Sequence, residues 1–137
     1  MSLQDLYREA ILDHYRHPRN RGELPDAQIK FRDTNPLCGD VIEFHIKVDG
    51  NNSVEDVKFA GEGCAISQAS ASMMTQMIKG KNMEWLKQLG KKDVLKMMGI
   101  DPGPTRIKCA LLPLKVVKAG VYQYLGMMLE KEDYESI

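Results

Sequence analysis

Two runs of alternating apolar and polar residues, joined by a short turn, constrain the fold of this chain more than any other feature. The runs are Val41–Val48 and Ser53–Ala60, and the turn between them begins with Asp49-Gly50. A period of two is typical of a strand with one buried face, and Asp-Gly between two such runs is a strong hairpin signal. A weaker run, Gln28–Asp33, precedes them. We therefore expect a small three-stranded antiparallel sheet.

The segments on either side of these strands carry helical patterns, because their apolar residues recur at steps of three and four. The expected helices are Leu3–Tyr15, Ala65–Lys79, Met83–Leu89, Lys92–Met98 and about Ala110–Met128. Pro18 and Gly80 are the expected stops of the first two, and Pro113 fits the last helix if it lies in the first turn. Strands and helices occupy separate stretches, which predicts an α+β fold with the helices packed mainly on one face of the sheet.

Length and charge favour one globular domain and exclude several classes of function. The 137 residues are 43% hydrophobic, so we expect a single domain over 1–137. Lys plus Arg and Asp plus Glu both number 19, a balance that does not favour nucleic acid or an anionic membrane surface. No apolar run approaches the ~20 residues needed to span a bilayer. The N-terminus carries acids and lacks the apolar centre of an export signal, so we expect a cytoplasmic protein with reduced thiols.

A thiol and a carboxylate precede the central strand, Val41–Val48. Cys38 and Asp40 share the parity of its apolar residues, so both lean toward the buried face if the extended backbone begins this early. A carboxylate there is costly unless it is paired or bound to a cation. Gly39 lets the backbone bend or a ligand approach closely. His45 has the opposite parity, and we expect it on the solvent face without a ligand role.

The chain has three cysteines, and an odd number in a reducing compartment argues against a disulfide framework. One interpretation is that they are small buried hydrophobic residues. Cys64 and Cys109, however, each lie immediately before an expected helix, where free N–H groups and the helix dipole favour thiolate. With Cys38 and Asp40 they would form a site of three thiolates and one carboxylate, suited to zinc or an iron–sulfur cluster. Their spacing matches no compact zinc motif, so the fold has to bring them together.

The remaining candidates have plainer interpretations. A Cys–His nucleophile would need a base near a thiolate, and no motif places a histidine there. His14 and His17 lie at the end of the first helix, where a cationic side chain suits the dipole, and we expect them on the surface. The methionines are expected in helix cores. Tyr7 and Tyr15 are expected to pack the first helix onto the domain, unless that helix is a contact for a partner or a homo-oligomer.

Each cysteine stands in a longer motif, and together the motifs resemble the IscU/SufU family of iron–sulfur cluster assembly scaffolds, which is NifU N-terminal-like. The motifs are NPLCGD, GEGCAISQASASMMT and RIKCALLPLK, and LYREAILDHYRHPRNRG is similar to the SufU-type opening. They occur in the family's order over most of the chain. The resemblance implies a SufE/NifU-like α+β fold in which the three cysteines meet at one exposed end. The ligands that it implies are Cys38, Asp40, Cys64 and Cys109.

The chain departs from each branch of the family at a different place. IscU scaffolds usually have a histidine directly before the third cysteine, whereas Lys108 stands here, as in SufU, and leaves Asp40 as the only evident fourth ligand. SufU proteins usually carry an insertion between the second and third cysteines, and the spacing from Cys64 to Cys109 has IscU-like length instead. The stretch Pro102–Arg106 barely matches the LPPVK motif of IscU proteins, so the resemblance does not carry chaperone recognition over to this chain.

Two functions are compatible with the resemblance. In the first, a scaffold receives sulfur from a cysteine desulfurase, builds a transient [2Fe-2S] cluster on the four ligands and passes it to apo iron–sulfur proteins. In the alternative, a zinc-dependent sulfurtransferase of the SufU type holds zinc on the same residues, and Cys38 or Cys109 accepts sulfur from a SufS-like desulfurase. Arg106 or Lys108 would then pair with Asp40 when a cysteine leaves the metal, or would simply be solvated.

The scaffold is the preferred interpretation, because the SufU insertion is missing. Whether the chain is an enzyme stays open, with the balance toward a non-enzymatic scaffold. A purely structural zinc domain is a third class that the family resemblance disfavours. The metal that is bound, the sulfur-accepting cysteine and the client proteins do not follow from the residues.

Overall fold

The structure is a computed structural model that describes residues 3–37 and 39–126, without the side chains of residues 3 and 4. Its sheet has three antiparallel strands in the order β1-β2-β3. The strands are β1 (Ile29–Asn35), β2 (Asp40–Val48) and β3 (Val54–Glu62). In the centre, Phe44 pairs with Phe31 on one side and with Phe59 on the other. The predicted sheet is confirmed, and β2 begins at Asp40, one residue before the alternating run.

The predicted helices are confirmed, although the last begins three residues before its predicted start and ends at Tyr124, and its predicted end at Met128 lies outside the described residues. They are α1 (Leu3–Arg16), α2 (Ala65–Ile78), α3 (Met83–Gln88), α4 (Lys91–Met98) and α5 (Ile107–Tyr124). The carbonyl of Gly103 accepts the backbone N–H groups of Arg106 and Ile107, so the chain is already turning before Cys109. Pro113 therefore lies inside α5 and not in its first turn. No helix in the described part of the chain has the length and apolar character needed to cross a membrane.

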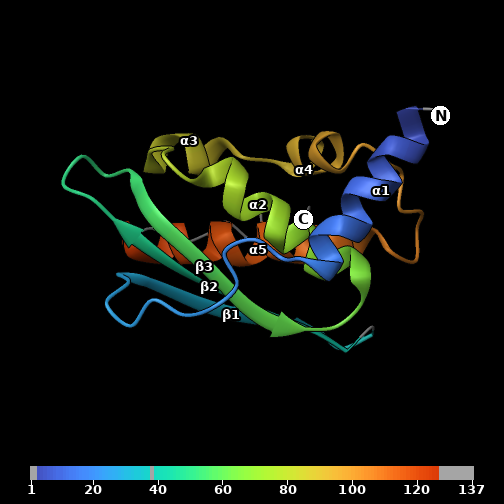
Figure 1. Ribbon diagram of the computed structural model, residues 1–137. Helices are drawn as coiled ribbons and strands as arrows, with labels where there is room; N and C mark the ends of the chain where they lie inside the picture. Colours follow the sequence, from blue (N-terminus) through green and yellow to red (C-terminus); the bar gives the residue numbers. More distant parts are fainter. Residues whose placement is uncertain (1–2, 38, 127–137) are drawn as a thin grey trace.

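Helices α2 and α5 cover one face of the sheet, and α1, α3 and α4 pack on these two helices (Figure 1). The α+β arrangement with helices on one face is thus confirmed. Ile42, Phe44 and Ile46 of β2 are fully buried beneath the helices. A register slip of one residue would turn all three toward the opposite face, so their burial fixes the pairing. From the helices, the core includes Ala71, Met74, Ile78, Leu114, Val117 and Val121.

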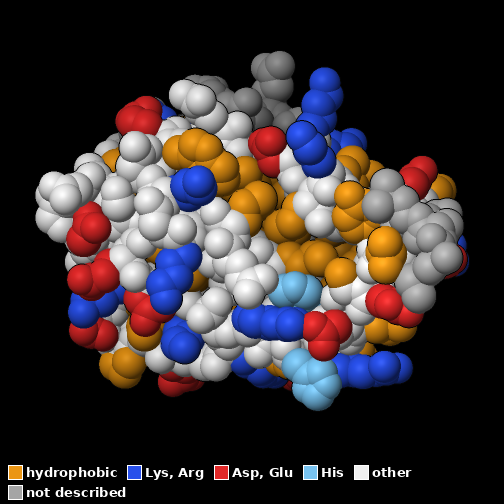
Figure 2. Space-filling model, turned by 45° about the horizontal axis from the view of Figure 1, so that its top comes forward, with side chains coloured by type: hydrophobic (Ala, Val, Ile, Leu, Met, Phe, Trp, Pro, Cys, Tyr) orange, Lys and Arg blue, Asp and Glu red, His pale blue; other side chains and the backbone are white. Residues whose placement is uncertain are grey.

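A second, smaller apolar cluster holds α1 against α2 and α4. Ile11 and Met98 are buried in it, and Figure 2 shows hydrophobic side chains gathered on this side of the molecule. The ring of Tyr7 lies against Gly99, where an added Cβ would be 2.2 Å from the ring. Tyr15 is 45% exposed, so it packs onto the domain less than predicted, and a contact of this helix with a partner stays a prediction. The methionines of α2 contribute to the cores, as predicted.

The segment 17–27 runs along β3 and then crosses the face of the sheet that the helices leave open (Figure 1). The backbone N–H of Leu24 donates to Nδ1 of His45 at 3.0 Å, and Nε2 of that ring lies 3.1 Å from Oε2 of Glu43. His45 is on the predicted face but only 6% exposed, so the expectation of a solvent-facing ring is wrong. His14 is also less exposed than predicted, since its Nδ1 lies 2.8 Å from Oγ of Ser72 in α2.

Candidate metal centre

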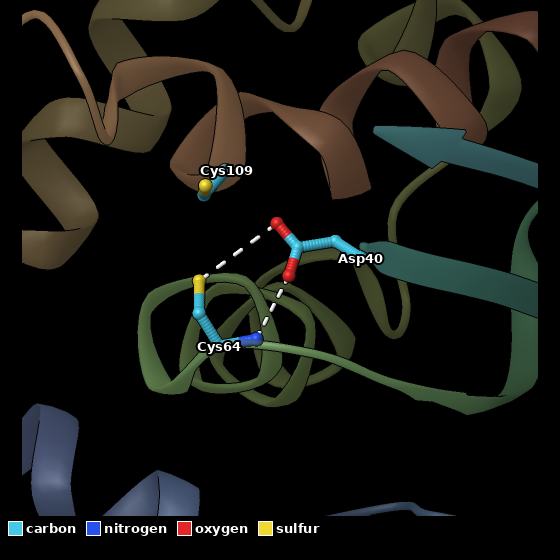
Figure 3. A group of neighbouring side chains, drawn as sticks. All are labelled: Asp40, Cys64 and Cys109. Carbon is cyan, nitrogen blue, oxygen red and sulfur yellow. Dashed lines mark hydrogen bonds between the residues drawn. The ribbon is translucent and has the colours of Figure 1, made fainter. Parts of the chain in front are cut away.

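Asp40, Cys64 and Cys109 come together where β2 begins and where α2 and α5 begin (Figure 3). Asp40 is the first residue of β2, Cys64 is the N-cap of α2, and Cys109 is in the first turn of α5. One ligand atom from each residue lies within 4.8 Å of the others. Three of the four predicted ligands therefore converge, although they are far apart in the sequence.

The carboxylate of Asp40 is fully buried and is held by the backbone of the second cysteine motif. Its Oδ1 accepts the N–H of Cys64 at 2.8 Å, and its Oδ2 lies 3.8 Å from the sulfur of the same residue (Figure 3). The N–H bond offsets part of the cost of burying the carboxylate at a helix N-terminus. One oxygen is thus fixed by the fold, and the other is directed toward the sulfur.

The Gly61-Glu62-Gly63 segment allows this close approach. Both glycines have positive φ angles, +141° and +143°. A Cβ on Gly63 would lie 2.2 Å from Oδ1 of Asp40, and one on Gly61 would lie 2.0 Å from the carbonyl oxygen of Val41. In the sequence, these glycines appear only as part of the motif around Cys64. The glycine pair before Cys64 was the signal that the backbone passes directly over the carboxylate.

Cys64 is partly exposed and is surrounded by a chain of polar contacts. Its sulfur lies 3.8 Å from Oγ of Ser67, a fully buried hydroxyl that donates to the carbonyl of Cys64. Nε2 of Gln68 donates to the same hydroxyl at 3.4 Å, and Arg21 donates to Oε1 of Gln68. Buried polar groups that are satisfied in this way hold a unique geometry. Ser67 and Gln68 were missed from the sequence, where they read as part of a helical pattern.

Cys109 is fully buried, and it lies inside the first turn of its helix, not before the helix as predicted. Its sulfur accepts a hydrogen bond from Nδ2 of Asn35 over 3.8 Å. Asn35 ends β1 and is the Cα partner of Asp40 across the sheet. No pattern in the sequence singles out Asn35, because its relation to Cys109 depends on how α5 packs on β1.

Cys38 lies outside the described residues, so its relation to the other three ligands stays a prediction. Its neighbours are described: Leu37 is 84% exposed, and Gly39 has a φ of +70° with open space where a Cβ would be. Asn35 and Asp40, on either side of this connection, are partners in the sheet. The chain therefore enters and leaves the connection next to the carboxylate.

An open cleft of about 550 Å³ lies at the two sulfur-bearing helix starts and includes Cys64 in its lining. Arg106 and Lys108 are exposed and line it, together with Asn35 and Leu37. Among the described residues, neither of the two basic side chains forms an ion pair with Asp40. The hypothesis that one of them pairs with Asp40 after a cysteine leaves a metal stays a prediction.

The donor atoms fit a thiophilic metal ion. A tetrahedral zinc ion with Zn–S bonds near 2.3 Å places its ligand atoms roughly 3.5–3.8 Å apart. The Cys64 sulfur and Asp40 Oδ2 are 3.8 Å apart, and all three ligand atoms are within 4.8 Å. Two thiolates with one carboxylate also suit iron in an iron–sulfur cluster better than they suit magnesium or calcium. The site can hold such a metal with small movements of its side chains.

Fold and site together define an α+β protein that presents helix-start cysteines around a carboxylate on a strand. The chain belongs to the family of the NifU-like N terminal domain, whose model matches residues 6–131. It is 44% identical to the zinc-dependent sulfurtransferase SufU of Bacillus subtilis, over 91% of this chain and 95% of that protein. It is 41% identical to the iron–sulfur cluster assembly scaffold protein IscU of Aquifex aeolicus, over 87% of this chain and 76% of the relative.

A solved structure agrees with this assignment. The crystal structure of a putative iron–sulfur cluster assembly scaffold protein for the SUF system, from Fervidobacterium islandicum, matches with a TM-score of 0.69 and 28% identity. The match covers 88% of this chain and 99% of the other. The family resemblance of the motifs is thus confirmed in both sequence and fold.

Proposed function

We propose that this chain is an iron–sulfur cluster assembly scaffold. It takes sulfur from a cysteine desulfurase, builds a transient [2Fe-2S] cluster and passes it to apo iron–sulfur proteins. The observation that carries the proposal is the convergence of the Asp40 carboxylate with the sulfurs of Cys64 and Cys109 beside an open cleft. We assign Cys38, in the connection between Asn35 and Asp40, as the third thiolate.

The predicted ligands suit a cluster that is bound transiently and then released. Cysteine thiolate is the preferred ligand of cluster iron, and a carboxylate is a harder and weaker one. Asp40 supplies that weaker ligand from a rigid position, since its other oxygen is held by the N–H of Cys64. Cys109 is buried and Cys64 is partly exposed, so the cluster would face the cleft from the Cys64 side. Release into an acceptor protein through the cleft needs no opening of the hydrophobic core.

A zinc-dependent sulfurtransferase is the second candidate, favoured by the identity of 44% to SufU and by the fit of the donors to zinc. Bound zinc would keep the ligating thiols deprotonated. A cysteine thiolate, from Cys38 or Cys109, would attack the outer sulfur of the desulfurase persulfide. A new S–S bond would form on this chain, and the desulfurase cysteine would leave as a thiolate.

The alignment lengths are compatible with the scaffold but do not decide between the candidates, because an IscU scaffold protein of Streptococcus pyogenes also aligns over 138 positions for 87% of this chain. The alignment with SufU runs over 142 positions, more than the 137 residues of this chain, so part of SufU has no counterpart here. The alignment with the Aquifex scaffold needs only 120 positions to cover 87% of the chain. This agrees with the IscU-like spacing between Cys64 and Cys109.

Anaerobic reconstitution separates the two candidates. The metal-free protein is incubated with ferrous iron, cysteine, a cysteine desulfurase and dithiothreitol, which reduces the persulfide sulfur to sulfide, and then with an apo-ferredoxin. The scaffold proposal expects the visible spectrum of a [2Fe-2S] cluster on this chain, followed by its transfer to the ferredoxin. Tight zinc binding when zinc is added back, stimulation of desulfurase turnover by the zinc-loaded protein and no transferable cluster would instead establish the sulfurtransferase.

A further inference from the structure

We propose that Asn35 is a positioning residue for the sulfur of Cys109. Its side-chain amide donates a hydrogen bond to that sulfur and directs it toward Asp40 and Cys64. The inference rests on the proposed function only in treating Cys109 as a ligand of the metal or cluster. The contact between Asn35 and Cys109 is a property of the protein itself.

The burial of Asn35 is the first observation behind the proposal. It is 8% exposed at the end of β1, and its neighbours include the fully buried Asp40 across the sheet. An amide buried at such a place is costly unless its donor and its acceptor both have partners. In this amide, both the donor nitrogen and the acceptor oxygen have a hydrogen-bond partner.

The partners fix the orientation of the amide. Oδ1 of Asn35 accepts the backbone N–H of Leu37 at 3.3 Å, and Nδ2 donates to the sulfur of Cys109 at 3.8 Å. If the amide were turned over, two donors would meet at Leu37, and the amide oxygen would face the sulfur. The backbone of the connection after β1 therefore dictates that the sulfur receives an N–H donor.

The two sulfurs of the site differ in this respect. The hydroxyl of Ser67 lies beside Cys64, but it donates its proton to a backbone carbonyl. Cys109 instead has an amide whose orientation the backbone has fixed. Hydrogen bonds to ligating sulfurs orient them and lower the electron density that they give to the metal. Loss of such an outer partner commonly lowers metal affinity by about 10- to 100-fold.

Cobalt is the probe, because Co²⁺ occupies tetrahedral thiolate sites and gives sulfur-to-cobalt charge-transfer bands. The test variant is Asn35→Leu, which has a similar volume and no hydrogen-bonding group, with Asn35→Ala as a smaller alternative if Leu prevents folding. We expect the charge-transfer band to move to longer wavelength, because the sulfur becomes more electron-rich. We also expect Co²⁺ affinity to fall about 10-fold.

Asn82→Ala is the matched control, since Asn82 also accepts a backbone N–H but lies at the other end of the sheet. It should lower the stability of the protein without moving the band. A band position and an affinity that stay at the wild-type values in both Asn35 variants would overturn the inference.

A metal-free measurement separates this inference from the proposed function. Denaturant unfolding of Asn35→Leu, Cys109→Ala and the double variant, without metal, gives the coupling between the two side chains. If the loss of unfolding free energy in the double variant differs from the sum of the two single losses, the contact is supported. If the losses are strictly additive, the inference is overturned. If the wild-type protein gave no sulfur-to-cobalt band, the proposed site would fail, and the metal-free coupling would still decide the role of Asn35.

Discussion

The two ends of the sheet use polar side chains for different purposes. At the hairpin end, between β2 and β3, they satisfy nearby backbone. Oδ1 of Asp49 accepts the N–H groups of Asn51 and Ser53 at 2.8 and 3.0 Å. Asn82 caps α3 by accepting the N–H of Trp85 at 2.8 Å. Bonds of this local kind stabilise turns and helix starts, and each is worth about 1 kcal/mol.

At the site end, the helices that carry Cys64 and Cys109 begin without any side-chain cap. The polar side chains there come from other elements and point toward the sulfurs or their supports. Asp40 takes the N–H of Cys64, and Asn35 donates to the sulfur of Cys109. The helices at the site end therefore lack local side-chain caps, and the hydrogen-bond donors and ligands there are held in place by tertiary packing.

Substitution of Asp40 gives the largest expected effect and tests whether the site end is built for metal. Asp40→Asn keeps the volume of the side chain and an oxygen that can accept the N–H of Cys64, but removes the charged ligand oxygen. We expect zinc affinity to fall by about 100-fold or more, which exceeds the usual loss when a residue that only hydrogen-bonds to a metal ligand is removed. The circular dichroism spectrum should not change. Competition with a chromophoric chelator measures the affinity.

Asp49→Asn is the control at the hairpin end, where it makes the same chemical change in a backbone-capping residue. It should leave zinc affinity at the wild-type value. If Asp40→Asn also bound zinc with wild-type affinity, Asp40 would not be a ligand, and its carboxylate would have only a structural role.

Two glycines with positive φ give the next largest effect. Gly63→Ala has to place a Cβ at 2.2 Å from Oδ1 of Asp40, whereas the Cβ of Gly80→Ala enters open space near the hairpin end. The second variant carries only backbone strain, about 1–2 kcal/mol. Gly63→Ala adds a steric clash to this strain. We expect its free energy of unfolding to fall by roughly 3 kcal/mol and its zinc binding to weaken. Urea unfolding and the chelator assay measure the two quantities, and equal losses in both variants would show that the close approach is unimportant.

The sequence predicted the sheet, the helices and the burial of Asp40, because these follow from local periodicity. Parity correctly placed Asp40 and His45 on opposite faces of β2. It did not predict that the segment 17–27 covers His45, because parity shows which way a side chain points and not what packs on it. The environment of Cys109 depends on the docking of α5 on β1, for which the spacing between the cysteines contains no information.

Asn82→Ala tests the hairpin end alone. The variant removes the cap of α3, so we expect a loss of about 1 kcal/mol in the free energy of unfolding. Zinc affinity should not change, because Asn82 pairs with Ser53 at the hairpin end of the sheet. A change in zinc affinity would mean that the two ends of the sheet are coupled and do not act independently.

The smallest expected effect concerns His14, which joins α1 to the middle of α2. Burial lowers the pKa of His14 below its ordinary value of 6.5, and the positive charge of Arg19 lowers it further, while Asp13 opposes the shift. Oγ of Ser72 accepts the N–H of Arg19, so its own proton is free to bond to Nδ1 of a neutral His14. Below about pH 6.5 the unfolded chain binds a proton that the folded protein resists, so stability falls as the pH is lowered through this value.

His14→Asn isolates this contribution, because Asn keeps an acceptor near the Nδ1 position and does not titrate. The urea midpoints of both proteins, without metal, are compared at pH 7.5 and pH 5.5. We expect the wild-type midpoint to fall more than that of the variant over this range. Contributions from groups that do not contact His14 are common to both proteins and cancel in the difference. Parallel pH dependences would mean that the contact between His14 and Ser72 is equally strong when the ring is protonated, and the coupling of α1 to α2 would then not depend on pH.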